Sequence, residues 1–248
     1  MALCLAESLI HCQGLDLADQ LERYVRWYRH GHNSSTGALF DIGITTREAL
    51  ERFEETGEAY AGPTHPRSAG NGSIMRLAPV PLAYASDLAA AATQSGESSR
   101  TTHGATAAVD ACRYLGLMIA TAARGADKAA VLSDEVWQES PLVPEIEEIA
   151  LGSFKRKEPP EIQGSGYVVR SLEAALWALY TTDDFRNGAL RAVNLGDDAD
   201  TTGAVYGQLA GTIYGEEAIP DEWLGQLAMR ERIVDLADSL LELSGGVR

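Results

Sequence analysis

Three aspartates lie within four residues of the chain, at Asp197, Asp198 and Asp200, and Thr201 follows them directly. Carboxylates this close repel one another unless a positive charge lies among them. A divalent cation supplies that charge, and hard oxygen ligands favour Mg²⁺, Ca²⁺ or Mn²⁺ over Zn²⁺. A helix-like run follows, and the short side-chain oxygens of Asp200 or Thr201 suit its N-cap. The segment therefore predicts a metal site at the start of a helix.

The run behind these aspartates repeats glycine every four residues, at Gly203, Gly207 and Gly211. This spacing places the glycines on one helix face, where we expect another backbone to pack closely. Two other interpretations of the aspartates stay open. Acidic residues are favoured at any helix start by the helix dipole. An EF-hand loop fits the first half of the segment, but Leu209 stands where such a loop needs a bidentate glutamate.

The composition bounds the class of protein. A chain of 248 residues, 45% hydrophobic and 23% charged, is typical of a globular protein with a sizeable core. The net charge of −16 argues against binding to the nucleic acid backbone and to anionic membranes, because both need a basic surface. A local polyphosphate site stays possible where backbone amides and a cation supply the positive field.

The cysteines indicate a reducing compartment. Cys4, Cys12 and Cys112 are few, odd in number and without C-x-x-C spacing, which is typical of reduced cysteines in a cytoplasmic protein without a zinc site. The longest apolar run, over residues 115–123, is too short to span a bilayer. Residues 1–10 are apolar but lack a basic start, so they do not resemble a signal peptide.

Helical periodicity dominates the chain, and alternating strand patterns are scarce. With no low-complexity linker and no fixed-period repeat, we expect one all-α domain over residues 1–248. The predicted helices cover residues 1–12, 16–28, 45–53, 77–84, 105–123, 144–151, 171–180, 184–193 and 230–243, and a further helix starts at Pro220.

Two glycine-rich segments precede helices, Gly70–Arg76 and Gly164–Tyr167. Small residues leading into a helix expose backbone amides, which can hold phosphate, although a plain turn explains such a segment as often. His103 lies at the start of the helix predicted over 105–123. A ligand-facing imidazole and a satisfied buried histidine are equally compatible with that position.

Four motifs together resemble the ADP-ribosylglycohydrolase family, and enzymes like dinitrogenase reductase-activating glycohydrolase in particular. They are Gly70-Asn71-Gly72-Ser73-Ile74-Met75-Arg76, Thr102-His103-Gly104, Gly164-Ser165-Gly166-Tyr167 and Gly196-Asp197-Asp198-Ala199-Asp200-Thr201-Thr202-Gly203, in the order of the family. The last motif is the most specific. The resemblance covers the chain from near Met1 to about Gly215.

The resemblance implies a compact orthogonal helical bundle with a two-metal centre of Mg²⁺ or Mn²⁺ in a central cleft. It implies hydrolysis of the glycosidic bond between ADP-ribose and an acceptor, often an arginine side chain, so the partner is ADP-ribose or an ADP-ribosylated protein. Asp198 or Asp200 would take the proton of the attacking water. The implied metal ligands are Asp198, Asp200 and Thr201, and the implied substrate-binding residues are Asn71, Gly72, Ser73, His103, Gly164 and Gly166.

The chain departs from the family pattern at two places. Asp197 stands where the family often has glycine. The family also carries a Thr-Asp-Asp ligand set directly before the helix that begins here at Met1, and an acidic residue further upstream. We therefore expect an N-terminally truncated member that lacks the first family helix and half of the metal shell. Two hypotheses follow: a hydrolase, which the retained Asp198, Asp200 and Thr201 favour, or a non-catalytic relative that binds ADP-ribose or is purely structural.

Overall fold

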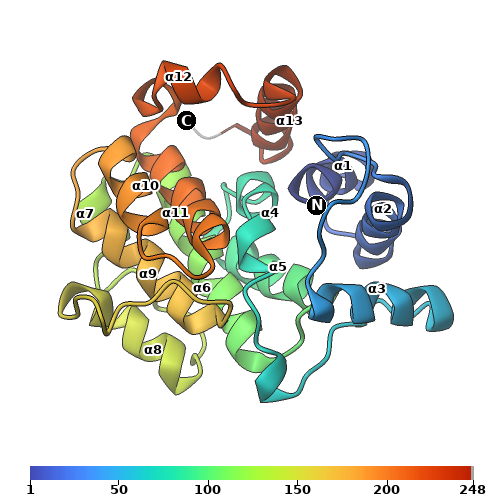
Figure 1. Ribbon diagram of the computed structural model, residues 1–248, viewed down its shortest axis with the longest axis horizontal. Coiled ribbons are helices and arrows are strands. Elements are labelled where there is room, and N and C mark those ends of the chain that lie inside the picture. The colour runs from blue at the N-terminus through green and yellow to red at the C-terminus, as the bar shows by residue number, and fades with distance from the viewer. Residues whose placement is uncertain (247–248) are drawn as a thin grey trace.

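The chain folds as helices arranged around two central ones (Figure 1). The computed structural model describes residues 1–246, and within that range the strand pairing is limited to one isolated bridge between Gly70 and Tyr167. The prediction of an all-α fold is confirmed. In chain order the α-helices are α1 (Ala2–Cys12), α2 (Leu17–His30), α3 (Ile44–Thr56), α4 (Pro79–Ala83), α5 (Leu88–Arg100), α6 (Thr106–Ala123), α7 (Lys128–Val131), α8 (Pro144–Ala150), α9 (Val168–Tyr180), α10 (Phe185–Val193), α11 (Ala199–Tyr214), α12 (Asp221–Leu224) and α13 (Arg230–Leu243). Short 3-10 helices are formed by η1 (Pro66–Ser68), η2 (Ile74–Arg76), η3 (Ser153–Lys155) and η4 (Glu216–Ala218).

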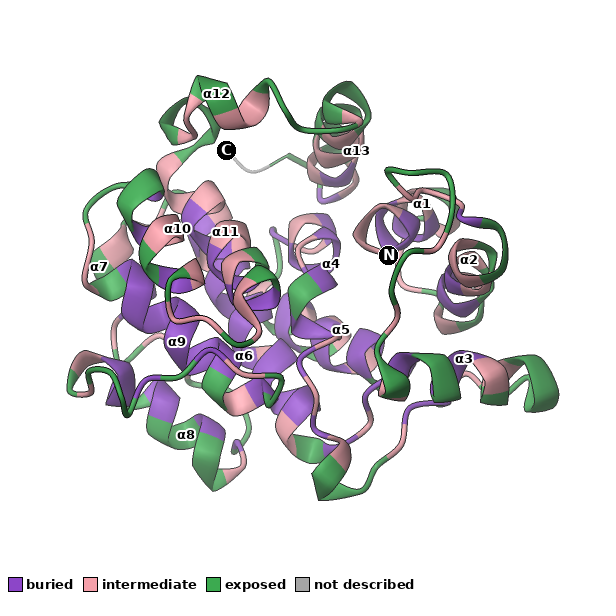
Figure 2. Cartoon of the chain, viewed as in Figure 1, coloured by how far each residue is buried: buried purple, intermediate pink, exposed green. Residues whose placement is uncertain are grey.

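Helices α6 and α9 form the centre of the molecule and are buried over most of their length (Figure 2). Both are apolar on nearly every side, and such a helix must be surrounded by other elements to be stable in water. Helices α5 and α11 pack on α6, and α10 and α11 pack on α9. Within residues 1–246, no helix is long and apolar enough to cross a membrane.

The sequence pattern does not predict α5, which forms over Leu88–Arg100. This helix is rich in Ala, Ser and Gly, so it lacks the large apolar side chains that reveal an amphipathic stripe. Its small residues allow a close approach to α6. A Cβ atom added at Gly116 would lie only 2.7 Å from Cβ of Ser95, and one at Gly96 would lie 2.7 Å from Cγ of Arg113. The close packing of α5 on α6 therefore depends on glycine at both positions.

The glycine face of α11 is not a backbone contact, so that prediction is wrong. A Cβ atom at Gly207 or Gly211 would meet no heavy atom within 4 Å, and one at Gly203 would approach only a side chain, Cγ1 of Val193, at 2.9 Å. The helix instead buries its opposite side, with residues that include Val205, Tyr206, Leu209 and Ala210. Larger apolar residues determine which face is buried, and the glycines are left half-exposed.

Several helix ends differ from the expected ones. The N-cap of α11 is Asp198 rather than Asp200 or Thr201, and its side chain makes no capping hydrogen bond. The helix predicted over 77–84 is the shorter α4, Pro79–Ala83, and the 3-10 helix η2 precedes it. Helix α1 begins at Ala2 without a side-chain cap, as its sequence indicates. The three cysteines are free thiols, with Cys4 and Cys112 buried.

Candidate active site

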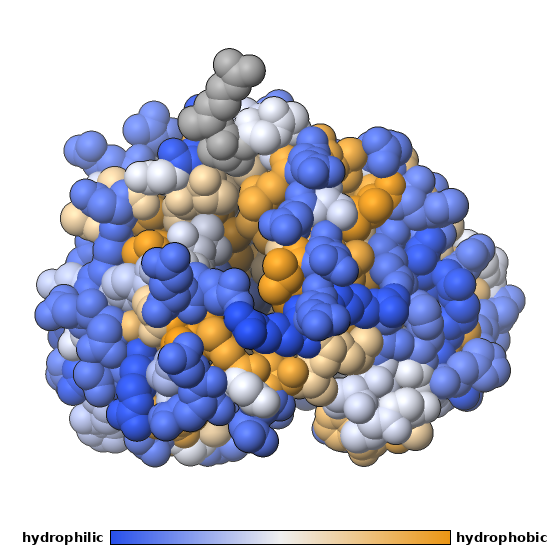
Figure 3. Space-filling view, turned by 90° about the horizontal axis from the view of Figure 1, so that it is seen from above, coloured by the Kyte–Doolittle hydropathy of each residue, from blue (hydrophilic) through white to orange (hydrophobic). Residues whose placement is uncertain are grey.

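A cleft of about 660 Å³ lies where α1, the loop between α2 and α3, the Gly70–Arg76 segment and the start of α11 meet. Its volume is within the range that small ligands and cofactors occupy. Figure 3 shows apolar atoms gathered around a hollow on the face seen from above. The cleft lining contains most of the predicted site residues, namely Asn71, Gly72, His103, Asp198, Asp200 and Thr201.

The Asp198 carboxylate is held in place by Asn71, a residue 127 positions earlier in the chain. The Asn71 side-chain nitrogen donates to Oδ2 of Asp198 at 2.7 Å. The same nitrogen lies 3.3 Å from the carbonyl oxygen of Ser165 and 3.3 Å from Oγ of Ser171, so the amide is fixed from several sides. Asn71 is buried, and Asp198 is half-buried at the cleft wall. The orientation of Asp198 is therefore set before any ligand binds.

The two glycine-rich segments pair with each other to form this wall. The amide of Asn71 donates to the carbonyl of Gly166 at 3.1 Å, next to the Gly70–Tyr167 bridge. The amide of Asp198 donates to the carbonyl of Gly164 at 3.2 Å. A Cβ atom at Gly166 would lie 3.7 Å from Oδ2 of Asp198. Backbone hydrogen bonds thus place the acidic segment against both glycine segments.

The three aspartates separate in space. Asp198 and Asp200 line the cleft, whereas Asp197 lines a different hollow. Gly196 and Asp197 both have positive φ, 76° and 53°, and this left-handed turn directs the Asp197 side chain away from its neighbours. Among residues 1–246, no three His, Cys, Asp or Glu side chains are grouped as metal ligands. The expected crowding of three carboxylates is therefore wrong, and two of them share the cleft.

The oxygens of Asp198, Asp200 and Thr201 nevertheless fit an oxygen-preferring divalent cation. All three residues line the cleft at the N-terminal turn of α11. Two carboxylates with one hydroxyl make a hard donor set of the kind that Mg²⁺ and Mn²⁺ accept, and Mg²⁺ keeps several waters in its shell. Oγ1 of Thr201 contacts a weak partner, the Met75 sulfur at 3.6 Å, so this oxygen is available for another ligand.

His103 closes the inner end of the cleft, between the C-terminus of α5 and the N-terminus of α6. Its ring packs against the glycine segment, because a Cβ atom at Gly72 would lie 2.8 Å from Cε1 and 3.1 Å from Nε2 of the imidazole. Glycine at position 72 is therefore required for this contact. Burial, with a smaller contribution from the nearby Arg76 charge, lowers the pKa of His103 to about 3. The imidazole is neutral at physiological pH.

Three predicted substrate-binding residues, Ser73, Gly164 and Gly166, do not line the cleft. The Ser73 side chain is buried beneath it, where Oγ of Ser99 lies 2.9 Å from Oγ of Ser73 and the Cys112 sulfur lies 3.4 Å from it. Burial raises the pKa of the Cys112 thiol to about 11, so this sulfur stays protonated. Gly164 faces the second hollow, behind the acidic segment. Gly166 lies next to the cleft, where its carbonyl accepts the hydrogen bond from the Asn71 amide. All three residues support the cleft from outside its lining.

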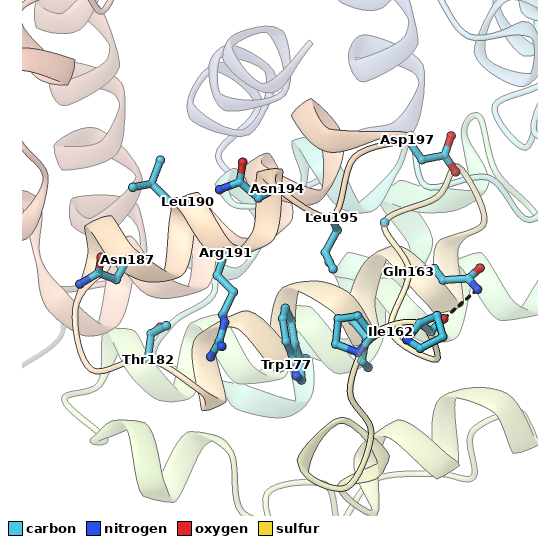
Figure 4. A pocket seen from close by; sticks show the side chains of 13 residues that line it. Ile162, Gln163, Trp177, Thr182, Asn187, Leu190, Arg191, Asn194, Leu195 and Asp197 are labelled. Carbon is cyan, nitrogen blue, oxygen red and sulfur yellow. Dashed lines mark hydrogen bonds between the residues drawn. The ribbon is translucent and has the colours of Figure 1, made fainter.

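The second hollow, of about 880 Å³, lies on the other side of the acidic segment (Figure 4). Its floor contains Trp177, with the Arg191 guanidinium 4.9 Å from the Trp177 ring centroid, and Asp197 is its one acidic lining residue. Although it is larger, it does not contain the paired carboxylates, Asn71 or His103. The smaller cleft is therefore the better candidate for chemistry.

Several cleft residues are not found by the sequence analysis. Apolar side chains stand at the rim, with Phe40 78% exposed and Ile44 67% exposed. The loop that carries Phe40 also brings Asp41, a third acidic residue of the cleft lining. Arg76, a buried residue of η2, lines the inner wall. An exposed aromatic residue in a polar loop is a sequence signal for a binding surface, but it does not tell which cleft it borders.

Comparison with known proteins identifies the family and the fold. A family model described as ADP-ribosylglycohydrolase matches residues 1–248, and the chain belongs to this family. It is 43% identical over 244 residues to "ADP-ribosylarginine hydrolase Tri1" of Serratia proteamaculans (strain 568), covering 98% of this chain and 66% of that protein. The chain therefore spans just under two thirds of this relative.

A further relative and a solved structure support the same family. The chain is 32% identical over 247 residues to an ADP-ribosyl-dinitrogen reductase glycohydrolase of Rhodospirillum rubrum, covering 99% of this chain and 78% of that protein. A solved structure named "ADP-ribosylglycohydrolase-related protein complex" superposes with a TM-score of 0.85 at 45% identity, covering 98% of this chain and 79% of that one. The predicted family and its helical fold are confirmed.

Proposed function

We propose that the chain is a metal-dependent hydrolase that cleaves the glycosidic bond between ADP-ribose and an arginine side chain. The observation that carries the proposal is the convergence of Asn71, His103 and Asp198 on one cleft, although they come from segments far apart in the sequence. The names of the relatives support ADP-ribosylated arginine as the substrate class. A net charge of −16 and three free cysteines support a protein partner, rather than nucleic acid or an anionic membrane, in the cytoplasm.

Asp198, Asp200 and Thr201 would hold a divalent cation, Mg²⁺ or Mn²⁺, with water completing its shell. The family pattern has two such ions, and the residues at the start of α11 offer one of the two sets of ligands that this pattern needs. When bound, the metal would supply Lewis acidity at the ribose. Asn71 fixes the direction of the Asp198 carboxylate, so that residue positions one ligand before the metal arrives.

The other residues of the cleft have distinct tasks in the proposed reaction. Departure of the acceptor builds positive charge on the ribose, and a nearby carboxylate, Asp198 or Asp200, stabilises it and accepts the proton of the attacking water. Gly72 and the His103 ring, which both line the cleft, would contact the diphosphate. The exposed rim at Phe40 and Ile44 contacts the acceptor protein.

The test is the release of free ADP-ribose from ADP-ribosylated arginine, measured with Mg²⁺ or Mn²⁺ and with a chelator. Asp198→Asn and Asp200→Asn should each lower the rate by about 10²-fold or more, because each removes a carboxylate from the cleft. Asp197→Asn is the matched control, since its side chain lines the other hollow, and it should keep full activity. Chelator-resistant release, or equal loss in all three variants, contradicts the proposal.

A second candidate function is binding of ADP-ribose without hydrolysis. It is favoured by the absence, in the described part of the chain, of a cluster of three acidic, histidine or cysteine ligands. Under this alternative, ADP-ribose with metal raises the melting temperature by mass action, but no ADP-ribose is released from the modified arginine. Release that depends on Asp198 excludes this candidate.

A further inference from the structure

Arg76 is a buried cation without an acidic partner. It is 3% exposed, and within residues 1–246 no carboxylate forms an ion pair with it. One terminal nitrogen donates to the carbonyl of Gly72 at 2.8 Å, and the other donates to Oγ1 of Thr102 at 2.6 Å. The guanidinium also lies 4.8 Å from the ring centroid of Tyr24, and its Nε has no partner in the described structure. The Arg76 guanidinium is therefore held by hydrogen bonds to Gly72 and Thr102 rather than by a salt bridge.

The Thr102 hydroxyl connects this cation to the imidazole. Thr102 is fully buried, and its Oγ1 lies 2.6 Å from the Arg76 nitrogen and 2.8 Å from Nδ1 of His103. A guanidinium only donates, so Oγ1 accepts there. The hydroxyl proton then needs an acceptor, and in the described residues Nδ1 of His103 is the one within reach. If Nδ1 carried a proton instead, the Thr102 hydroxyl proton would be buried without a partner.

We propose that Thr102, oriented by Arg76, is a positioning residue that holds His103 in the tautomer with its proton on Nε2, so that this N–H is a fixed donor to an oxygen atom of the ligand. Nε2 faces the glycine segment, 3.1 Å from a Cβ atom added at Gly72 and 3.4 Å from one added at Gly70. Among residues 1–246, no acceptor is bonded to Nε2.

The charge of the imidazole follows from the same arrangement. Burial and the Arg76 charge disfavour protonation, and no carboxylate forms an ion pair with His103 in the described chain. His103 therefore binds an anionic or carbonyl oxygen through one neutral hydrogen bond. It does not act as an imidazolium counter-ion or as a general acid near neutral pH. The tautomer is a property of the ligand-free protein and is independent of the proposed reaction, whereas the role of Nε2 as a donor to the ligand rests on the proposed function.

The test reads the ring nitrogens of His103 by ¹H–¹⁵N NMR in the uniformly labelled 248-residue chain, which has 5 histidines. His103→Gln assigns the signals by removing them. We expect a protonated Nε2 and a bare Nδ1, unchanged from about pH 8 to about pH 5, where an ordinary histidine titrates. Thr102→Val, which keeps the shape of the side chain but removes the hydroxyl, should shift both nitrogens toward a mixture of tautomers. Thr102→Ser should restore the wild-type signals.

Three results would overturn the inference. They are a proton on Nδ1 in the wild-type protein, a ring that titrates near the ordinary pKa of histidine, and a Thr102→Val spectrum identical to that of the wild type. If Thr102→Val does not fold, the inference is tested by the tautomer of the wild-type protein and by the Thr102→Ser variant. A proton on Nδ1 in either protein would overturn it. A purely structural role for Thr102 would change the melting temperature of the variants without changing the tautomer.

Discussion

Replacing Gly72 by alanine tests how tightly the glycine segment and the imidazole fit together. The added Cβ atom would lie 2.8 Å from Cε1 of His103, whereas carbon atoms in contact prefer about 3.5–4.0 Å. The ring or the loop must therefore move by about 0.7 Å or more. The ring cannot move freely, because Nδ1 is bonded to Thr102 and the His103 amide donates to the carbonyl of Ser99 at 2.7 Å.

Overpacking of this kind costs about 1–3 kcal/mol of the free energy of unfolding. For a chain of this size, about 1 kcal/mol corresponds to roughly 2–4 °C in melting temperature, so we expect Gly72→Ala to melt roughly 2–12 °C lower. The measurement is thermal unfolding by circular dichroism, repeated with saturating ADP-ribose and Mg²⁺. The variant should also lose part of the ligand-induced rise in melting temperature, because the displaced ring lies in the cleft.

Gly207→Ala is the matched control for this experiment. Gly207 lies inside α11, and a Cβ atom added there would meet no heavy atom within 4 Å. Alanine should stabilise the helix by about 0.4–1 kcal/mol, through the lower entropy of the unfolded chain. If Gly72→Ala melted at or above the temperature of Gly207→Ala, the close contact between Gly72 and His103 would be refuted.

Three further predictions concern protons, metal and packing. Because the folded-state pKa of His103 lies below its unfolded value, the unfolded chain binds more protons, and stability falls as the pH drops below about 6.5. Each pH unit costs about 1.4 kcal/mol, or about 2 kcal/mol by pH 5, and urea unfolding of His103→Gln over this range should lack that loss. Asn71→Ala removes the donor to the Asp198 carboxylate, which we propose as a metal ligand, and should weaken Mn²⁺ binding by about 10–100-fold in calorimetry. Asn187→Ala, on the surface, should not weaken it. Gly188→Ala would place a Cβ atom 2.1 Å from the Tyr206 hydroxyl oxygen, and we expect the largest fall in melting temperature of any glycine variant tested here, which an unchanged melting curve would contradict.

The helices were largely predictable because their signals are local. The N-cap aspartates before α2 and α10 and the apolar stripe of α13 mark elements that the structure confirms over nearly the predicted ranges. Helix α5 lacks such a stripe, since its packing face is made of Ala, Ser and Gly. The burial of α11 was misjudged because glycine spacing marks a face but does not say which face has the greater apolar area to bury.

The candidate site was predictable as a set of residues but not as a geometry. The family resemblance selects Asn71, His103 and Asp198, and all three line one cleft. The divergence of Asp197 depends on two consecutive left-handed residues, which no composition rule reveals. The contact from Arg76 to Thr102 joins residues 26 positions apart and depends on how η2 packs beside the end of α5. Such contacts are tertiary, so periodicity and propensity carry no information about them.

The pairing of the two glycine-rich segments has a consequence for how this protein folds. The contacts that fix Asn71 join it to residues 94, 100 and 127 positions away, whereas helices form from neighbours along the chain. Closing loops of that length lowers the chain entropy before the contacts contribute any favourable energy, so we expect such contacts to form late. A folding intermediate could therefore have most of its helices and still have no ligand-binding cleft. In stopped-flow refolding, recovery of ADP-ribose binding should lag behind recovery of the helical circular dichroism signal.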